Sequence, residues 1–78
     1  MTPAKSTADR IRDARNAARL TQRELADRLE LRDALAVSRW ERGRNLPSEA
    51  VRERLAAALG VTVEALFSVP SERTERAA

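Results

Sequence analysis

The sequence predicts an all-α fold, in which five short helices form one compact domain. Its apolar residues are mainly alanine, leucine and valine, with one tryptophan, one phenylalanine and no tyrosine, which suits closely packed short helices. They recur at steps of three and four residues, the period of a helix with one buried face. The two glycines and three prolines stand where helices are expected to begin or end. With 78 residues and no cysteine, the domain must be stabilised by its core alone.

The first helix is expected to begin near Ser6 or Thr7, with Thr7 as the capping residue and Asp9 in the first turn. Residues 1–7 show no periodicity and are predicted to form a flexible tail. Steps of three and four place four residues on one face, namely Ala8, Ile11, Arg15 and Ala18. Arg15 is a charge on an otherwise apolar face, which indicates an ion pair or a side chain that reaches to solvent.

The second helix has the most clearly specified start in the chain. Thr21 and Glu24 are spaced as a capping box, in which each side chain accepts a hydrogen bond from the backbone N–H of the other residue. Leu20 and Leu25 flank this box at positions that allow a hydrophobic staple across the helix start. We expect this helix to end near Leu29.

A turn over residues 30–32 leads to the third helix, which is expected to run from Ala34 to about Arg42 with Asp33 as its N-cap. Gly43 can adopt the left-handed conformation that ends a helix. The helical period divides the residues between two sides, with Val37 and Trp40 facing the core and Leu35, Ser38, Arg39 and Arg42 facing outward.

Two further helices are expected to complete the domain. Ser48 is expected to cap the fourth helix, which Gly60 ends, and a short fifth helix is expected over residues 63–67. The inner face of the fourth helix is predicted to consist of Val51, Leu55, Ala58 and Leu59. The domain is expected to span residues 8–68 without an internal boundary, and residues 69–78 are expected to be disordered because they have no apolar face.

The stretch from Leu20 to Gly43 thus contains two short predicted helices joined by a tight turn. This is the helix-turn-helix pattern, whose second helix commonly enters the major groove of DNA. The other helices are interpreted as support for this unit, since each of them is too short to be stable alone.

Composition excludes several classes of function. Without histidine or cysteine, the chain has no usual zinc ligands and no cysteine or histidine catalysis, so neither a metal nor a cofactor is expected. No apolar run approaches the roughly 20 residues that span a membrane, and the N-terminus lacks the apolar segment of a secretory signal. A cytoplasmic protein with no membrane association and no enzymatic activity is expected, because so small a domain leaves little room for a catalytic cleft.

Basic residues outnumber acidic residues by 15 to 12, which gives a net charge of +3, and Lys5 is the only lysine. Arginine side chains suit phosphates and guanine edges, so this composition favours a nucleic-acid partner. A GC-rich genome also raises the arginine and alanine content, so the number of arginines alone does not separate the two explanations.

Three segments of the chain carry a family signature. They read LTQRELADRL at the start of the second helix, VSRWERGRNLPS across the end of the third, and LAAALGVTVEALF near the C-terminus. Together, over roughly residues 10–68, they resemble the phage-repressor-type helix-turn-helix family, also called the XRE or Cro/CI family. The resemblance implies a lambda-repressor-like domain that binds double-stranded operator DNA as a transcriptional repressor, usually as a homodimer associated with the nucleoid.

The resemblance also implies roles for individual residues. Gln22 corresponds to a glutamine that usually meets a backbone phosphate, and Arg44 and Asn45 correspond to a loop that commonly touches phosphate. Arg15 and Glu41 correspond to a partly buried ion pair that ties the first helix to the third. The resemblance also matches Ala34, Leu35, Ser38 and Arg39 to groove-facing positions. The full predicted DNA-binding set is Thr21, Gln22, Arg32, Ala34, Leu35, Ser38, Arg39, Arg42, Arg44 and Asn45.

Two departures from the family pattern affect the turn and the third helix. The family turn usually contains glycine before an apolar residue, whereas this chain has Glu30-Leu31-Arg32-Asp33, which is one residue longer and lacks glycine. Since a residue other than glycine is unfavourable at positive φ, we expect the chain to turn by another route. Ala34 and Leu35 stand where the family often has polar residues, and their side chains cannot hydrogen-bond base edges.

The expected mechanism separates affinity from specificity. Affinity is expected from arginines and from backbone N–H groups at the start of the second helix, and it should fall steeply with salt. Specificity is expected from Arg39, whose guanidinium can bind O6 and N7 of guanine with the assistance of Ser38. Ala34 and Leu35 can pack on thymine methyl groups. Alternatively, Gln22 is an ordinary first-turn residue and the arginines are solvated charges.

Dimer contacts are expected from apolar residues that follow the third helix, although packing in the core is an equally good explanation for them. The candidates are Leu46, Val63, Leu66 and Phe67. A second hypothesis is a protein-interaction module, such as an antitoxin or a subunit that binds another regulator. In that case Leu35 would be the apolar anchor for the partner protein, and DNA binding would be secondary.

Overall fold

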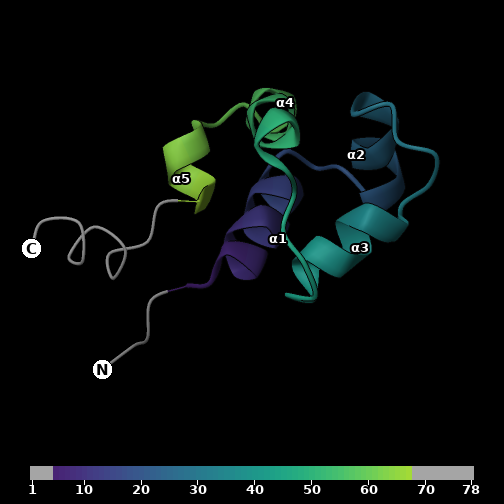
Figure 1. Cartoon of the computed structure of the whole chain (residues 1–78). Coiled ribbons are helices and arrows are strands. Elements are labelled where there is room, and N and C mark those ends of the chain that lie inside the picture. Colours follow the sequence, from purple (N-terminus) through teal and green to yellow (C-terminus); the bar gives the residue numbers. More distant parts are fainter. Residues whose placement is uncertain (1–4, 68–78) are drawn as a thin grey trace, which may run out of the picture.

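The computed structural model describes residues 5–67, which form five α-helices and no β-strand. The helices are α1 (Thr7–Ala17), α2 (Gln22–Arg28), α3 (Leu35–Glu41), α4 (Glu49–Leu59) and α5 (Val63–Phe67). Figure 1 shows α1 near the centre, with α2 and α3 on one side of it and α5 on the other. The predicted all-α fold of five helices is confirmed. Within residues 5–67, no helix is long and apolar enough to cross a membrane.

An apolar core holds the helices together. α1 packs against α3 and α5, α2 packs against α3, and α4 packs against α5. The buried apolar residues are Ile11, Leu20, Leu25, Ala26, Leu29, Val37, Trp40, Leu55, Ala56, Leu59 and Leu66. Val37 and Trp40 therefore face the core as predicted, whereas Ala18 is exposed rather than on the inner face, because α1 has already ended at Ala17. Such short helices depend on this shared core for their stability.

α1 begins at Thr7, as expected, but its cap is Ser6 rather than Thr7. The Ser6 hydroxyl accepts a hydrogen bond from the Asp9 backbone N–H at 3.1 Å, and the Asp9 carboxylate accepts one from the Ser6 N–H at 3.4 Å. Lys5 also pairs with Asp13 at 2.6 Å. These contacts place residues 5–7 in the folded part of the chain, not in a tail. Residues 1–4 and the expected C-terminal tail, 69–78, lie outside the described residues.

The capping box predicted for α2 is present. Thr21 Oγ1 accepts a hydrogen bond from the Glu24 N–H at 3.0 Å, and Glu24 Oε1 accepts one from the Thr21 N–H at 2.8 Å. Leu20 and Leu25 are both buried in the core, as a hydrophobic staple requires. The helix ends with Leu29 at its C-cap, also as predicted.

α1 to α4 all end in a Schellman motif, in which one residue with left-handed backbone is followed by a hydrogen bond back across the last turn. The left-handed residues are Arg19, Glu30, Gly43 and Gly60, with φ of 60°, 58°, 74° and 73°. The expectation that the chain would avoid positive φ after α2 is therefore wrong. Two contacts offset the steric cost of positive φ at Glu30. The motif packs Leu31 against the core, and Arg54 Nη2 donates to the Leu29 carbonyl at 2.6 Å.

Glu30→Gly is expected to raise the free energy of unfolding by about 0.5–1 kcal/mol, because glycine has no Cβ and adopts positive φ without a steric penalty. The Glu30 side chain itself contributes little to stability, because its ion pair with Arg54, at 3.7 Å, is exposed to solvent. The measurement is denaturant unfolding followed by the fluorescence of Trp40, the only tryptophan. Gly43→Ala, at φ 74° in the same motif, is the matched control and should destabilise. Loss of stability in Glu30→Gly would contradict the proposed strain.

α3 runs from Leu35 to Glu41, so it is one residue shorter at each end than predicted. Ala34 occupies the N-cap, with φ −84° and ψ 1°. Asp33 still stabilises the start of the helix, since its Oδ1 accepts a hydrogen bond from the Leu35 N–H at 2.9 Å. Asp33 therefore accepts this hydrogen bond from the position before the N-cap, and not from the N-cap itself.

The last two helices match their predicted positions. Ser48 is the N-cap of α4 and has the extended backbone expected there, although its side chain makes no capping hydrogen bond within the described residues. α5 has the predicted bounds, and Thr62 Oγ1 accepts a hydrogen bond from the Ala65 N–H at 3.1 Å. On the predicted inner face of α4, Leu55 and Leu59 are buried and the other two residues are half-buried.

The two capping boxes predict a contribution to stability that is sensitive to acid. The hydrogen bond from the Thr21 backbone, followed by that from its hydroxyl, lowers the pKa of Glu24 below its ordinary value of 4.5. The side-chain hydrogen bond with Ser6, followed by that with its backbone, lowers the pKa of Asp9 below 3.8. Since both pKa values are lower in the folded protein, the stabilisation is present above these ordinary values and is lost as pH falls through the folded pKa.

Glu24→Gln tests this linkage, because glutamine cannot ionise. The Tm of the variant should lie below that of the wild type above pH 4.5, and the two should converge as pH falls further. Melting curves over a series of acidic buffers measure the difference. A difference in Tm that is the same at every pH would contradict the prediction.

Candidate nucleic-acid interface

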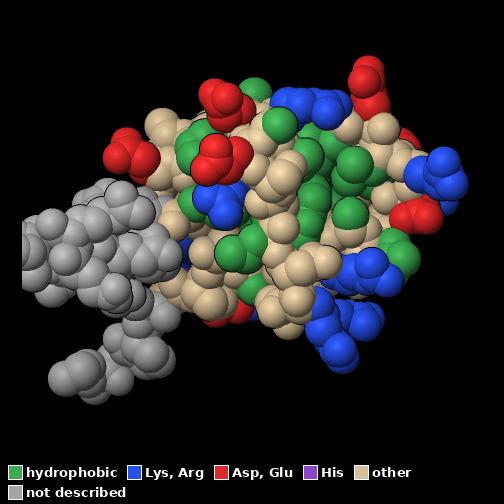
Figure 2. Space-filling model, viewed as in Figure 1, with side chains coloured by type: hydrophobic (Ala, Val, Ile, Leu, Met, Phe, Trp, Pro, Cys, Tyr) green, Lys and Arg blue, Asp and Glu red, His purple; other side chains and the backbone are tan. Residues whose placement is uncertain are grey.

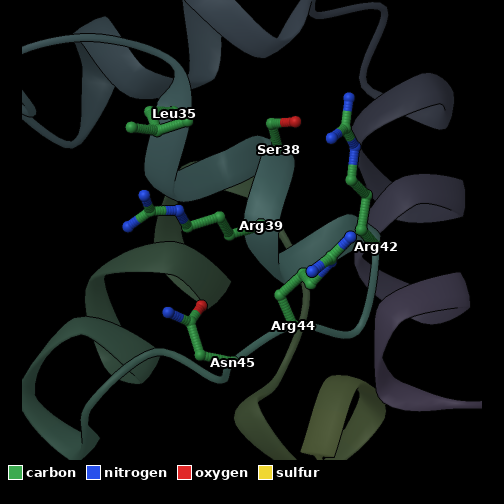
Figure 3. Close-up of a pocket in the computed structure, with 6 residues that line it drawn as sticks. All are labelled: Leu35, Ser38, Arg39, Arg42, Arg44 and Asn45. Carbon is green, nitrogen blue, oxygen red and sulfur yellow. The ribbon is translucent and has the colours of Figure 1, made fainter.

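A pocket of about 420 Å³ lies along the outer side of α3 and the segment that follows it. It is lined by Leu35, Ser38, Arg39, Arg42, Arg44 and Asn45. Figure 3 shows the first three side chains rising from α3, with Arg42, Arg44 and Asn45 contributed by the end of the helix and the next segment. All six belong to the predicted DNA-binding set, so the structure brings this part of the set together on one surface.

The arrangement follows from the sequence of α3. Val37 and Trp40 are buried, which fixes the rotation of the helix and turns the positions between them outward. Gly43 then ends the helix at φ 74° and directs Arg44 and Asn45 along the same surface. The surface therefore combines guanidinium, amide and hydroxyl groups, which donate hydrogen bonds, with an apolar side chain, Leu35, that is 52% exposed.

The other four predicted DNA-binding residues lie outside this pocket. Thr21 is exposed at the start of α2 and serves as its cap, and Arg32 is exposed in the turn before α3. Ala34 is half-buried and packs against the core, so it is less available for base contact than predicted. Gln22 is half-buried and takes part in a network of hydrogen bonds.

This network centres on Glu41, the one buried charged residue among residues 5–67, with 7% of its surface exposed. Arg15 Nε donates to Glu41 Oε2 at 2.6 Å, and Arg15 Nη2 donates to Glu41 Oε1 at 3.0 Å. The predicted ion pair between α1 and α3 is therefore present. Hydrogen bonding to Glu41 raises the pKa of Arg15, so the guanidinium stays charged. Arg15 Nη1 also donates to the Leu20 carbonyl at 2.8 Å, just before α2.

Two contacts near this interface were not predicted from the sequence. Gln22 Nε2 donates to Glu41 Oε1 at 3.1 Å, which joins α2 to the ion pair. Arg54 of α4 donates to the carbonyl at the end of α2, which braces the turn before α3. No local pattern reveals either contact, because the paired residues lie 19 and 25 positions apart.

Charge is distributed unevenly over the molecule. In the view of Figure 2, acidic side chains gather over the side formed by α4 and α5, while basic side chains gather beside the end of α3. The pocket itself is lined by Arg39, Arg42 and Arg44 without an acidic residue among its lining side chains. An anionic partner would therefore be attracted to this side. Within residues 5–67, no group of acidic side chains is placed to hold a metal ion.

The four dimer candidates occupy different environments. Leu46 is 54% exposed in the segment between α3 and α4, and Val63 and Phe67 are half-buried on α5. Leu66 is only 1% exposed, so of the two explanations given for it, dimer contact and core packing, the second holds. Arg52 lies over the ring of Phe67, with its guanidinium carbon 4.9 Å from the ring centroid.

Comparison with known proteins gives both a family and related structures. A family model described as a helix-turn-helix domain matches residues 8–67. A hypothetical transcription factor, NHTF, from Neisseria is 32% identical, with 97% of each chain covered and a TM-score of 0.73. The restriction-modification controller protein C.AhdI from Aeromonas hydrophila is 34% identical, with 78% of this chain and 91% of that chain covered and a TM-score of 0.72.

A third structure, the P22 c2 repressor in complex with a synthetic operator, is 25% identical. The match covers 83% of this chain and 97% of that chain, with a TM-score of 0.78. Comparison with curated proteins gives no significant match.

Proposed function

The chain belongs to the phage-repressor-type helix-turn-helix family, and from this premise we propose that it is a transcriptional repressor that binds operator DNA as a homodimer in the cytoplasm. The observation that carries the proposal is the outer surface of α3. Six residues from the predicted DNA-binding set line one pocket there, and three of them are arginines. The P22 c2 repressor, which has a similar fold, has been solved with a synthetic operator.

Base readout is assigned to α3. Arg39 is exposed in the last turn of the helix, where its guanidinium can donate two parallel hydrogen bonds to guanine O6 and N7. Leu35 lies one helical turn before it and is exposed enough to contact a thymine methyl group. Ser38, between them, is half-buried and lines the same pocket. The half-site should therefore include guanine near thymine.

Phosphate contacts are assigned to the residues that flank α3. Arg42, Arg44 and Asn45 also line the pocket, and Gln22 is the first residue of α2. These contacts position the protein on the duplex but carry no sequence information of their own. They should make the affinity depend steeply on salt, because each neutralised phosphate releases counterions.

The experiment that tests the proposal is selection of bound sequences from a random pool of duplex DNA, followed by anisotropy titration of the enriched duplex. We expect two half-sites whose centres lie about one helical turn apart, and an affinity for the enriched duplex at least 10³-fold above that for random duplex. A folded protein that enriches no sequence and binds no duplex at low salt would rule out the proposal.

The homodimer is proposed to form through the exposed Leu46 and the half-buried Val63 and Phe67. Sedimentation of the protein alone and with the enriched duplex tests this part. We expect a dimer at least on the DNA, and Leu46→Glu should weaken it. One protomer per selected duplex at saturation would rule out the homodimer while leaving DNA binding intact.

The exposure of Leu35 favours one alternative, a module that binds a partner protein and uses DNA secondarily. A leucine that is 52% exposed on a helix can anchor an apolar partner surface. In that case Leu35→Glu would abolish a stoichiometric protein complex without changing DNA affinity. Under the main proposal the same variant lowers DNA affinity, because it places a carboxylate against the duplex.

A further inference from the structure

Glu41 contacts a third residue besides its ion-pair partner, because it also accepts a hydrogen bond from Gln22. The Glu41 side chain comes from α3, Arg15 comes from α1 and Gln22 comes from α2. One buried carboxylate therefore connects the three helices, and it comes from α3, the helix that carries the surface assigned to DNA. The ion pair alone would need only two of these helices.

The chemistry of these groups fixes the orientation of the Gln22 amide. An ionised carboxylate only accepts hydrogen bonds, so only the –NH₂ end of the amide can face Glu41. If the amide turned by half a rotation, its carbonyl oxygen would face the carboxylate oxygen at the 3.1 Å now occupied by the nitrogen. Arg15 also donates to both oxygens of Glu41, at 2.6 Å and 3.0 Å, so the carboxylate is already an acceptor in two hydrogen bonds besides the one from Gln22.

A phosphate, like a carboxylate, only accepts hydrogen bonds at its anionic oxygens. The Gln22 nitrogen carries two hydrogens, so one can bind Glu41 while the other binds a phosphate oxygen. A neutral amide held in this way is suited to lie between two anions, and its carbonyl end is directed away from both. A free glutamine would instead lose rotamer freedom and settle the choice of amide end only on binding.

We propose that Glu41 is a positioning residue, which presents the N–H of Gln22 to a backbone phosphate of bound DNA and is itself held by Arg15. This inference rests on the proposed DNA-binding function and specifies how one phosphate contact is preorganised. Glu41 does not touch the DNA, and its effect on affinity passes through Gln22.

The test is a double-variant cycle of DNA affinity with a random-sequence 20-base-pair duplex at low salt as the probe, because a phosphate contact does not depend on sequence. The first variant is Gln22→Met, which keeps the length of the side chain but removes its donors. The second carries Arg15→Met and Glu41→Leu together, which replaces the ion pair by apolar groups instead of breaking it. The third combines all three changes.

We expect Gln22→Met to weaken binding about ten-fold in the wild-type background. The paired replacement should weaken binding by roughly three- to ten-fold, and adding Gln22→Met to it should cost less than about three-fold more. Circular dichroism and the fluorescence of Trp40 establish that each variant is folded. An equal cost of Gln22→Met in both backgrounds would overturn the proposal, since Gln22 would then act independently of Glu41.

A second measurement requires no change to the protein. Gln22 is the only glutamine in the chain, so labelling with ¹⁵N-glutamine gives the side-chain amide of this residue alone. Its hydrogens should exchange more slowly than those of the exposed Asn45 amide, labelled separately, and their signals should shift when the random duplex is added. Exchange as fast as that of Asn45, or signals unchanged by bound duplex, would overturn the proposal.

The outcomes separate this inference from the function on which it rests. If the wild-type protein binds no duplex, the proposed function fails. If it binds duplex but Gln22→Met has no effect on affinity, DNA binding stands and the positioning role of Glu41 is wrong.

Discussion

Replacing Arg15 by methionine is expected to lower the free energy of unfolding by about 3–5 kcal/mol, because it leaves the Glu41 carboxylate buried without its charge partner. The side chains of the pair are only 13% and 4% exposed, so water cannot replace the lost hydrogen bonds. A chain of 78 residues has a total stability of roughly 4–12 kcal/mol. The variant should therefore lose a large fraction of its total stability, which urea titration with Trp40 fluorescence measures.

Arg12→Met is the matched control, because it makes the same change on the same helix. Arg12 pairs with Asp9 at 2.6 Å, but both side chains are more than 40% exposed. An exposed pair contributes only about 0–1 kcal/mol, so this variant should remain folded. Similar losses in the two variants would show that burial of the Arg15–Glu41 pair is not the cause.

Replacing both members of the buried pair should restore most of the stability. In the Arg15→Met and Glu41→Leu protein, no charge is left in the core and the apolar groups fill a similar volume. The ion pair is therefore a weak source of net stability even though breaking it is costly. Because the protein with both replacements should stay folded, the positioning role proposed for Glu41 can be measured in it.

The parts of the fold that sequence predicted well depend on neighbouring residues. The start of α2 needs only Thr21 and Glu24, three positions apart, and both hydrogen bonds are present. The start of α1 carried an equivalent signal, since Asp9 follows Ser6 by three positions. Choosing Thr7 instead missed the reciprocal bond that only Ser6 makes with Asp9.

The turn after α2 could not be predicted from local preference. A penalty against positive φ disfavours Glu30, but the penalty is about 1–2 kcal/mol for one residue. Two contacts outweigh this penalty: Leu31 packs against the core, and Arg54 donates to the Leu29 carbonyl. Both contacts involve other parts of the fold, so local preference does not reveal them. Leu66 shows the same limit, because an apolar residue on a short helix suits a core and a dimer contact equally.

The candidate site divides in the same way. The outward positions of α3 follow from the period set by Val37 and Trp40, which identified Leu35, Ser38, Arg39 and Arg42 before the fold was known. The other two pocket residues, Arg44 and Asn45, were expected only from the family resemblance. The bond between Gln22 and Glu41 spans 19 positions and joins two helices. It depends on how α2 and α3 cross, and periodicity within one helix does not report that angle.

Arg39→Ala is expected to remove most of the discrimination at one base pair in each half-site. A bidentate contact between arginine and guanine contributes about 1–3 kcal/mol against the wrong base. The enriched duplex should therefore lose roughly 10- to 100-fold in affinity for each half-site, whereas duplexes that already carry another base at that position should lose little. Selection from a random pool should then show no preference at that position.

Arg44→Ala is the control for charge alone, because Arg44 lines the same pocket but is assigned to a phosphate. It should weaken binding to all sequences by a similar factor and lower the slope of log affinity against log salt by about one. Arg39 is exposed on α3, while Arg44 follows the helix, so the two changes remove equal charge from different places on the same surface. If Arg39→Ala gave the uniform loss expected for Arg44→Ala, Arg39 would be a phosphate contact, and base readout would have to come from Leu35 and Ser38.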